Sequence, residues 1–222
     1  MNDFLIFGAS GLTGSCFLEG AKKEDKTFHL YVRNLLEGES SDNQTIFDSQ
    51  NIPKFPNSKT LIICLGYPLL SYLDLIFMKN SLKDPFSNVD QDLVVDVAKK
   101  AFSQGIENIA VISAVGANKN SPSYYLKTKG VMESEVEKIG FKKIIFARPG
   151  HLLGKRDPSR MSVSTSFIEF IGRFYNFLLL GPLKKFRNVE ARVVANKVLE
   201  STRSSYSGSL YSIEYNKIIK TS

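Results

Sequence analysis

Three side chains in the middle of the chain have the types and the spacing of a proton-transfer site. Ser113 follows an apolar run, Tyr125 comes twelve positions later, and Lys129 follows Tyr125 by four. Residues four apart on a helix share one face, so a helix here would place Tyr125 and Lys129 one turn apart. A phenol has a pKa of about 10 in model peptides, and a neighbouring ammonium stabilises its phenolate. The pattern favours proton transfer to a carbonyl oxygen, with Tyr125 as the acid, Lys129 as its electrostatic partner and Ser113 as a hydrogen-bond donor to the same oxygen.

A tyrosine and a lysine four residues apart also occur often by chance, as decoration of a helix surface. Tyr124 illustrates this alternative, because the residue four positions after it is Thr128, which carries no charge. The pair of Tyr125 and Lys129 differs in its position, because it follows a serine at a strand end in a chain that opens on a nucleotide-binding motif. This position favours a catalytic or cofactor-binding role, in which Lys129 also holds ribose hydroxyls of the cofactor.

That motif is the glycine-rich stretch after the first apolar run of the chain. Residues 4–7 are apolar, as in the buried first strand of a parallel sheet, and they lead directly into Gly8-Ala9-Ser10-Gly11-Leu12-Thr13-Gly14. Glycines let the backbone turn sharply and approach a ligand closely, and the N-terminus of the following helix attracts phosphate oxygens. A glycine loop without a ligand is the alternative. The turn predicts a dinucleotide site formed by Gly8, Ser10, Gly11, Leu12, Thr13 and Gly14.

The residue after the second predicted strand indicates which dinucleotide is bound. This strand covers residues 28–32, and Arg33 follows it, 19 positions after Gly14. At this place an acid would bind the ribose 2′-hydroxyl of NAD, whereas a guanidinium binds the 2′-phosphate of NADP. Arg33 therefore favours NADP(H) over NAD(H), and a solvated arginine is the alternative. A short strand at residues 45–47 would place Asp48 near the adenine end of the cofactor.

Apolar strands and amphipathic helices alternate along the rest of the first two thirds. Strands are predicted at residues 59–65 and 108–112, and helices at residues 88–104 and 124–139. This alternation is typical of a doubly wound parallel sheet with helices on both faces, a Rossmann-type α/β fold. Leu65 and Gly66, at the end of the first of these strands, would then lie where the cofactor crosses the sheet edge.

Composition restricts the class of protein. The 222 residues suffice for one domain, 43% of them are hydrophobic and 23% are charged. The net charge of +7 is spread over scattered lysine and arginine pairs, so a solvated surface together with attraction for an anionic cofactor explains it, and no nucleic-acid partner is expected. Two cysteines, Cys16 and Cys64, and two histidines argue against a disulfide and against a metal site.

The two ends of the chain lead to further expectations. The first strand begins within three residues of Met1, which leaves no room for a signal or transit peptide, so residence in the cytoplasm is expected. Residues 150–222 are expected to form a small substrate-covering region of the single domain 1–222, with 166–186 as its most apolar stretch. Glu169 and Arg173 interrupt that stretch and argue against a transmembrane span. The alternatives for it are a cover over the substrate pocket or packing on the core, a homo-oligomer contact such as a homodimer, and a membrane-surface segment.

Several motifs together resemble the atypical branch of the short-chain dehydrogenase/reductase superfamily, and within it the Tat-interacting-protein-type oxidoreductases. The resemblance covers most of the chain and rests on Gly8-Ala9-Ser10-Gly11-Leu12-Thr13-Gly14, Cys64-Leu65-Gly66, Val89-Asp90-Gln91-Asp92, Ser113-Ala114-Val115-Gly116-Ala117, Tyr125-Leu126-Lys127-Thr128-Lys129-Gly130 with Glu133, and Arg148-Pro149-Gly150-His151-Leu152-Leu153. It implies an NADP(H)-binding Rossmann domain with Ser113, Tyr125 and Lys129 as a triad. It further implies that Pro149, Gly150 and Leu152 lie against the nicotinamide.

The chain departs from this family at two places. Family members usually have two serines where Ser113-Ala114 stands, which leaves Ser113 as the serine available. Tyr67-Pro68 follows Gly66 where small polar residues are commoner, and this difference would alter the substrate side of the pocket.

Three hypotheses about function follow from these motifs and from the resemblance. The first is an NADP(H)-dependent oxidoreductase that acts on a small carbonyl or alcohol substrate through the triad. The second is an NADPH-sensing regulatory protein with little or no turnover, which binds a protein partner; several family members resemble regulators of this kind. The third is a nucleotide-sugar epimerase or dehydratase, which the small number of residues after Arg148 disfavours.

Overall fold

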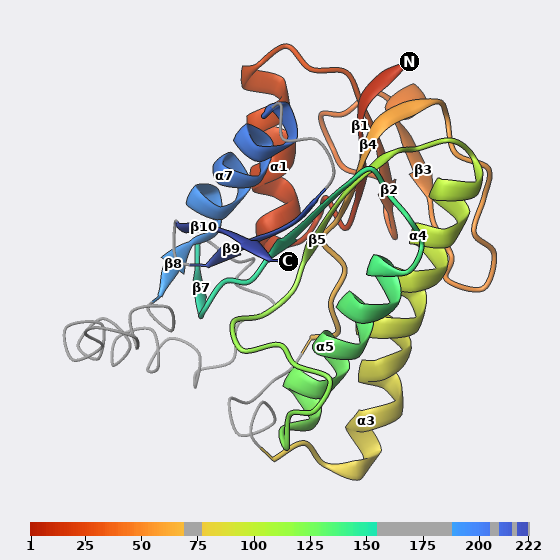
Figure 1. The fold of residues 1–222 in the computed structure, drawn as a ribbon. Coiled ribbons are helices and arrows are strands. Elements are labelled where there is room, and N and C mark those ends of the chain that lie inside the picture. The colour runs from red at the N-terminus through yellow and green to blue at the C-terminus, as the bar shows by residue number, and fades with distance from the viewer. Residues whose placement is uncertain (69–76, 155–187, 205–208, 215–216, 222) are drawn as a thin grey trace.

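The fold is built on a sheet that has helices on both faces (Figure 1). The computed structural model describes residues 1–68, 77–154, 188–204, 209–214 and 217–221. Eight strands of these residues form the sheet, in the order β10-β9-β6-β5-β4-β1-β2-β3. All neighbours pair in parallel except β9 and β10, which are antiparallel. The strands are β1 (Asn2–Phe7), β2 (Phe28–Val32), β3 (Gln44–Ile46), β4 (Ser58–Ile63), β5 (Asn108–Ile112), β6 (Lys143–Ala147), β9 (Ser209–Glu214) and β10 (Lys217–Thr221).

The order β3-β2-β1-β4-β5-β6 is that of a Rossmann fold, which confirms the predicted class. The helical layers follow from the chain path. On one face lie α1 (Leu12–Lys23) and α7 (Ala191–Arg203), and on the other lie α4 (Leu93–Ser103) and α5 (Tyr124–Glu137) (Figure 1). Because both faces are covered, the central strands are apolar in both directions.

The side chains of strand β1 contribute to the hydrophobic clusters on both faces of the sheet. Its side chains alternate, so that Leu5 and Phe7 join the hydrophobic cluster under α4 and α5. Phe4 and Ile6 join the second cluster, under α1 and α7. All four are at most 5% exposed, so β1 is buried on both faces of the sheet and holds the turn that follows it in place.

The predicted helix at residues 88–104 is the second part of a longer helical segment. The segment begins with α3 (Asn80–Ser87), continues through the π-helical stretch η2 (Asn88–Asp92) and ends with α4. A π-helical turn inserts one extra residue and rotates the side chains that follow it. The stretch η2 contains a buried acid, Asp90, which is only 3% exposed.

The elements after residue 140 were not predicted from the sequence. These are β6, α7, the edge strands β9 and β10, and a small parallel pair formed by β7 (Leu152–Leu153) and β8 (Val189–Glu190). The described parts of the region 150–222 thus add to the sheet and to its helical layer, and a substrate cover stays a prediction. The apolar stretch 166–186 lies outside the described residues. No helix in the described part of the chain is long and apolar enough to span a bilayer.

A buried lysine joins two of these unpredicted elements. Lys143 opens β6 and is 8% exposed. Its Nζ atom donates to the carbonyl oxygens of Ser201 at 3.3 Å, Thr202 at 3.1 Å and Ser204 at 2.6 Å. These carbonyls belong to the C-terminal end of α7, where helix carbonyls lack intrahelical partners and where the helix dipole favours a cation.

We predict that Lys143→Met lowers the free energy of unfolding by about 1–3 kcal/mol, because three carbonyl groups then lose a charged donor. Chemical denaturation followed by circular dichroism measures this change. Lys142→Met is the matched control, because its side chain is 71% exposed and pairs with the exposed Glu107. Equal effects of the two substitutions would contradict the anchoring role of Lys143.

Candidate active site

The predicted site residues follow four parallel strands at one edge of the sheet. Gly8 comes after β1, Leu65 after β4, Ser113 after β5 and Pro149 after β6. The chain order reverses between β1 and β4, and in open α/β sheets ligands bind outside the carboxyl ends of strands at such a point. The topology therefore brings the glycine turn and Ser113 to the same edge.

The glycine turn is tightly packed, and Gly8 and Gly14 leave no room for a side chain. Gly8 has a φ of +79°, and a Cβ atom on it would lie 2.7 Å from the carbonyl oxygen of Cys64. A Cβ atom on Gly14 would lie 2.1 Å from the carbonyl oxygen of Gly8, and one on Gly11 would lie 3.3 Å from the same oxygen. The turn thus packs its own backbone against β4 and α1, and it leaves the N-terminus of α1 at the sheet edge.

Helix α1 begins at Leu12, with Gly11 as its N-cap. Glycine has no side chain to accept from the first N–H groups of the helix, and these groups attract anions. Ser10 is exposed and Thr13 is buried. The residues of this turn therefore fit a diphosphate, which needs free backbone donors and a close approach to the chain.

The two residues predicted near the adenosine lie at exposed positions. Arg33 follows β2, the strand that pairs with β1, and no ion pair with another described residue is found for it. Asp48 is also exposed, and its carboxylate accepts a hydrogen bond from the backbone N–H of Gln50 at 3.0 Å. Leu65 is partly buried beside the cluster under α4, and Gly66 is exposed.

The central feature of the site is the buried ammonium of Lys129. Its Nζ atom lies 2.7 Å from Oδ1 of Asp90, and both side chains are at most 5% exposed. It also donates to the carbonyl oxygen of Ile112 at 3.3 Å, directly before Ser113. Burial alone would lower the pKa of Lys129, but the negative charge of Asp90 and the neighbouring Tyr125 raise it above its ordinary value.

Tyr125 lies in the first turn of α5, one turn before Lys129. Its ring packs at a tilt against Phe86 of α3, with 5.4 Å between the ring centroids. Burial raises the pKa of Tyr125; Lys129 lowers it and Asp90 raises it. The net shift is upward, so the lysine does not make this phenol more acidic overall, because burial opposes it and Asp90 adds a negative charge nearby.

Ser113 has a buried hydroxyl with no partner among the described residues. The residue is 4% exposed, and its backbone N–H donates to Ala147 of β6 at 2.7 Å. Buried hydroxyls are almost always hydrogen-bonded, so an unpaired one marks a place where a polar group of a ligand can bind. This unpaired hydroxyl stands one residue from the carbonyl that Lys129 contacts.

An ion pair connects the end of β6 to α5. Arg148 donates to Glu133 through Nε at 2.9 Å and through Nη2 at 2.6 Å. The next residue, Pro149, is buried, and its carbonyl oxygen accepts from the N–H of Val115 at 2.9 Å. Gly150 is partly buried. These bonds fix the start of the loop that contains Pro149 and Gly150 beside the residues after β5.

The remainder of that loop belongs to the small parallel strand pair. Leu152, the last of the predicted cofactor contacts, is partly buried in β7 and pairs with Val189 of β8. The carbonyl oxygen of His151 accepts from the N–H of Val189 at 2.9 Å. The loop after β6 is thus tied to the segment that leads into α7.

Asp90 is a site residue that was not predicted from the sequence, where it stands only within a family motif. A signal was present. Asp90 precedes Val94, Val97 and Ala101 at helical spacing, so it is an acid on an otherwise apolar stripe. Tyr124, by contrast, points to α3, where its hydroxyl donates to the carbonyl oxygen of Lys83 at 3.3 Å.

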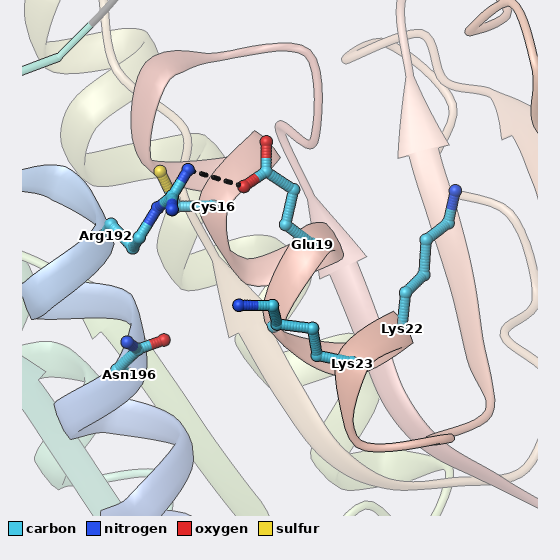
Figure 2. Close-up of a pocket in the computed structure, with 7 residues that line it drawn as sticks. Cys16, Glu19, Lys22, Lys23, Arg192 and Asn196 are labelled. Carbon is cyan, nitrogen blue, oxygen red and sulfur yellow. Dashed lines mark hydrogen bonds and ion pairs between the residues drawn. The ribbon is translucent and has the colours of Figure 1, made fainter.

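A surface groove of about 530 Å³ lies elsewhere, between α1 and α7, and contains none of the predicted catalytic residues (Figure 2). It is lined by Cys16, Glu19, Gly20, Lys22, Lys23, Arg192 and Asn196. Arg192 pairs with Glu19 at 3.3 Å, as Figure 2 shows, and Lys22 pairs with Glu39. Burial raises the pKa of the Cys16 thiol, which keeps it protonated.

The described residues contain no cluster of three His, Cys, Asp or Glu side chains that could hold a metal ion.

Comparison with known proteins places this arrangement in a family. The chain is 30% identical over 167 residues to the protein FMP52, mitochondrial, of Debaryomyces hansenii, a match that covers 72% of this chain and 70% of the relative. It is 31% identical over 162 residues to the protein of the same name in Saccharomyces cerevisiae, covering 71% and 69%. Protein HTATIP2 of Rattus norvegicus is 31% identical over 165 residues, covering 70% and 64%. No family model matches the chain.

Solved structures agree on the fold. MoeE5 in complex with UDP-glucuronic acid and NAD superimposes with a TM-score of 0.71 at 13% identity, covering 98% of this chain and 78% of that one. Human epimerase family protein SDR39U1 with NADPH superimposes with a TM-score of 0.67 at 12% identity, covering 95% and 73%. At these identities the likeness concerns the Rossmann architecture alone.

The comparison corrects one expectation, that of residence in the cytoplasm. The FMP52 relatives are named as mitochondrial proteins, which conflicts with a purely cytoplasmic location. The expectation was wrong because it was based on where the first strand begins, whereas receptors recognise targeting signals independently of the fold.

The identities to FMP52 and HTATIP2 extend over more than two thirds of the chain, and the fold is that of the superfamily predicted from the motifs. The chain therefore belongs to the atypical branch of the short-chain dehydrogenase/reductase superfamily, a family of NAD(P)H-binding oxidoreductases.

Proposed function

We propose that this protein is an NADP(H)-dependent oxidoreductase that acts on a small carbonyl or alcohol substrate through Ser113, Tyr125 and Lys129. The observation that carries the proposal is the buried hydroxyl of Ser113, which has no partner among the described residues and lies one residue from the carbonyl that the Lys129 ammonium contacts. A buried hydrogen-bond donor beside a buried cation is suited to an oxygen that becomes negatively charged.

Each residue has a separate task in this proposal. The nicotinamide, when bound, donates or accepts a hydride. Ser113 donates a hydrogen bond to the substrate oxygen, and Tyr125 gives that oxygen a proton or takes one from it. The raised pKa of Tyr125 keeps its proton in place near neutral pH, as an acid requires. Lys129 holds ribose hydroxyls and stabilises the phenolate that remains after the proton is transferred.

The glycine turn and Arg33 support the choice of nucleotide. Gly8, Gly11 and Gly14 bring the backbone close to a diphosphate, and Ser10, Leu12 and Thr13 complete that turn. Arg33 provides an exposed guanidinium after β2 for a 2′-phosphate, with Asp48 after the neighbouring strand. Leu65, Gly66, Pro149, Gly150 and Leu152 would border the rest of the cofactor.

A second candidate function is an NADPH-sensing regulatory protein that turns over little or no substrate. One observation favours it: the net pKa shift of Tyr125 is upward, so the phenolate is harder to form than in a free tyrosine. Such a protein would bind NADPH and respond to it through a partner. The two candidates make different predictions for turnover and the same prediction for nucleotide binding.

We expect Arg33→Ala to weaken NADPH binding about tenfold and to leave NADH binding within about twofold, because only NADPH has a 2′-phosphate for a charge-assisted hydrogen bond. Isothermal titration calorimetry with both nucleotides measures this selectivity. Lys142→Ala is the control, since it removes one positive charge from an exposed side chain before β6. A parallel loss for both nucleotides would show that Arg33 does not read the phosphate.

Tyr125→Phe is expected to reduce turnover at least about 100-fold while NADPH affinity stays within about threefold, because the substitution removes the proton donor and keeps the ring against Phe86. NADPH oxidation with a panel of small aldehydes and ketones measures the rate. Tyr124→Phe is the matched control and should retain the wild-type rate, because its hydroxyl contacts α3. Undiminished activity of Tyr125→Phe would refute the mechanism, whereas NADPH binding without turnover in the wild type would favour the regulatory candidate.

A further inference from the structure

We propose that Asp90 is a positioning residue for the reaction, whose carboxylate keeps the buried Lys129 charged and in place at the sheet edge. The inference rests on the proposed function for the use of Lys129, and it adds a residue on a different helix to the three that the motifs supply. The ion pair is present in the protein without nucleotide, so the role of Asp90 can be tested independently of catalysis.

The carboxylate of Asp90 is held by both of its oxygens. Oδ1 lies 2.7 Å from the Nζ atom of Lys129, and Oδ2 accepts a hydrogen bond from the backbone N–H of Tyr67 at 2.6 Å. The second bond is made to the loop after β4, next to Gly66. Asp90 therefore connects the lysine on α5 to a loop that is predicted to border the cofactor.

The backbone around Asp90 explains why a helical acid is buried here. Asp90 lies in the π-helical stretch η2, between the regular turns of α3 and α4. Pro85 lies inside α3, and proline removes a backbone donor from a helix. The helical geometry therefore changes at Asp90, an acid in line with the apolar stripe of α4. Such π-helical turns often occur at functional sites.

A buried ammonium needs a counter-charge, and Asp90 is the acid that provides it. A lysine without one loses its proton when it is buried, because transfer from water to the protein interior disfavours the charged form. The other groups that act on Lys129 are the phenol of Tyr125 and the carboxylate of Glu133. Glu133 forms its own bidentate pair with Arg148, and the carbonyl of Ile112 carries no full charge.

Loss of the Asp90 charge should therefore make Lys129 titrate at lower pH. With Asp90, the pKa of Lys129 is raised above that of the unfolded chain, so stability does not change through this group until pH exceeds the unfolded value of about 10.5. Without that charge, burial lowers the pKa of Lys129 in the folded state. The unfolded chain then binds more protons between the two pKa values, and stability rises with pH over that interval.

The decisive experiment compares Asp90→Asn with the wild type by urea denaturation from pH 6.5 to pH 9.5, without nucleotide. We expect the ratio of the two unfolding equilibrium constants, Asp90→Asn over wild type, to fall at least about tenfold from the lower to the higher pH, because the folded variant holds the proton of Lys129 less tightly than its unfolded chain does. Asp92→Asn is the matched control. It removes the same charge from the same helical stretch at an exposed position, and its ratio should stay constant.

A double variant identifies the titrating group. Adding Lys129→Met to Asp90→Asn removes the buried cation, and the pH dependence relative to the wild type should disappear. If Asp90→Asn alone does not fold at pH 6.5, the double variant is expected to restore folding. A constant ratio for Asp90→Asn, or a pH dependence that persists in the double variant, would overturn the proposal, as would a double variant that remains unfolded.

Calorimetric titration with NADPH then tests the consequence for binding. The affinity of Asp90→Asn should fall from pH 6.5 to pH 9.5 by at least about tenfold more than that of the wild type and of Asp92→Asn, because its lysine loses the charge. A loss that is equal at every pH would indicate a merely structural role and contradict the proposal. A wild type that does not bind NADPH would defeat the proposed function, while the denaturation result would still decide the role of Asp90.

Discussion

The buried ion pair between Asp90 and Lys129 is the interaction on which the candidate site depends. Two charges taken out of water cost solvation energy, and their attraction offsets that cost only when geometry is good and the remaining polar atoms are paired. Here the pair distance is 2.7 Å, Asp90 also accepts the N–H of Tyr67, and Lys129 also donates to Ile112. The pair therefore fixes α5 relative to η2 and to the end of β5, and Tyr125 and Ser113 take their positions from those elements.

The parallel sheet supplies the rest of the arrangement. Because the carboxyl ends of parallel strands meet at one edge, residues from β1, β4, β5 and β6 converge there, although the ends of β1 and β6 are more than a hundred positions apart in sequence. Alternation along β1 anchors this edge in two hydrophobic clusters, and the absence of side chains at Gly8 and Gly14 lets the turn close onto β4 and α1. Rigidity at this edge is what a site needs to hold a substrate between a donor and an acid.

Much of the fold could be predicted because the decisive signals are local. An apolar run followed by three glycines identifies β1 and its turn, and helical spacing of apolar residues identifies α4. The spacing of Tyr125 and Lys129 indicated a shared helix face, and the structure confirms that both lie on α5. The family could be predicted because its motifs are distributed along most of the chain.

The interactions that were missed depend on contacts between distant residues. Nothing in the local sequence of Lys143 shows that it binds the end of α7, which lies some sixty residues later. The partner of Lys129 is likewise on another helix, and Asp90 alone carries only the weak signal of an acid on an apolar stripe. The net direction of the Tyr125 pKa could not be predicted for the same reason, because it depends on burial and on Asp90 as well as on Lys129.

A crystal structure of the protein grown with saturating NADPH would show where the nucleotide binds. We expect the diphosphate over the turn from Gly8 to Gly14, the 2′-phosphate beside Arg33 and the nicotinamide next to Ser113 and Tyr125. Nucleotide bound elsewhere, or absent from this edge of the sheet, would refute the proposed site.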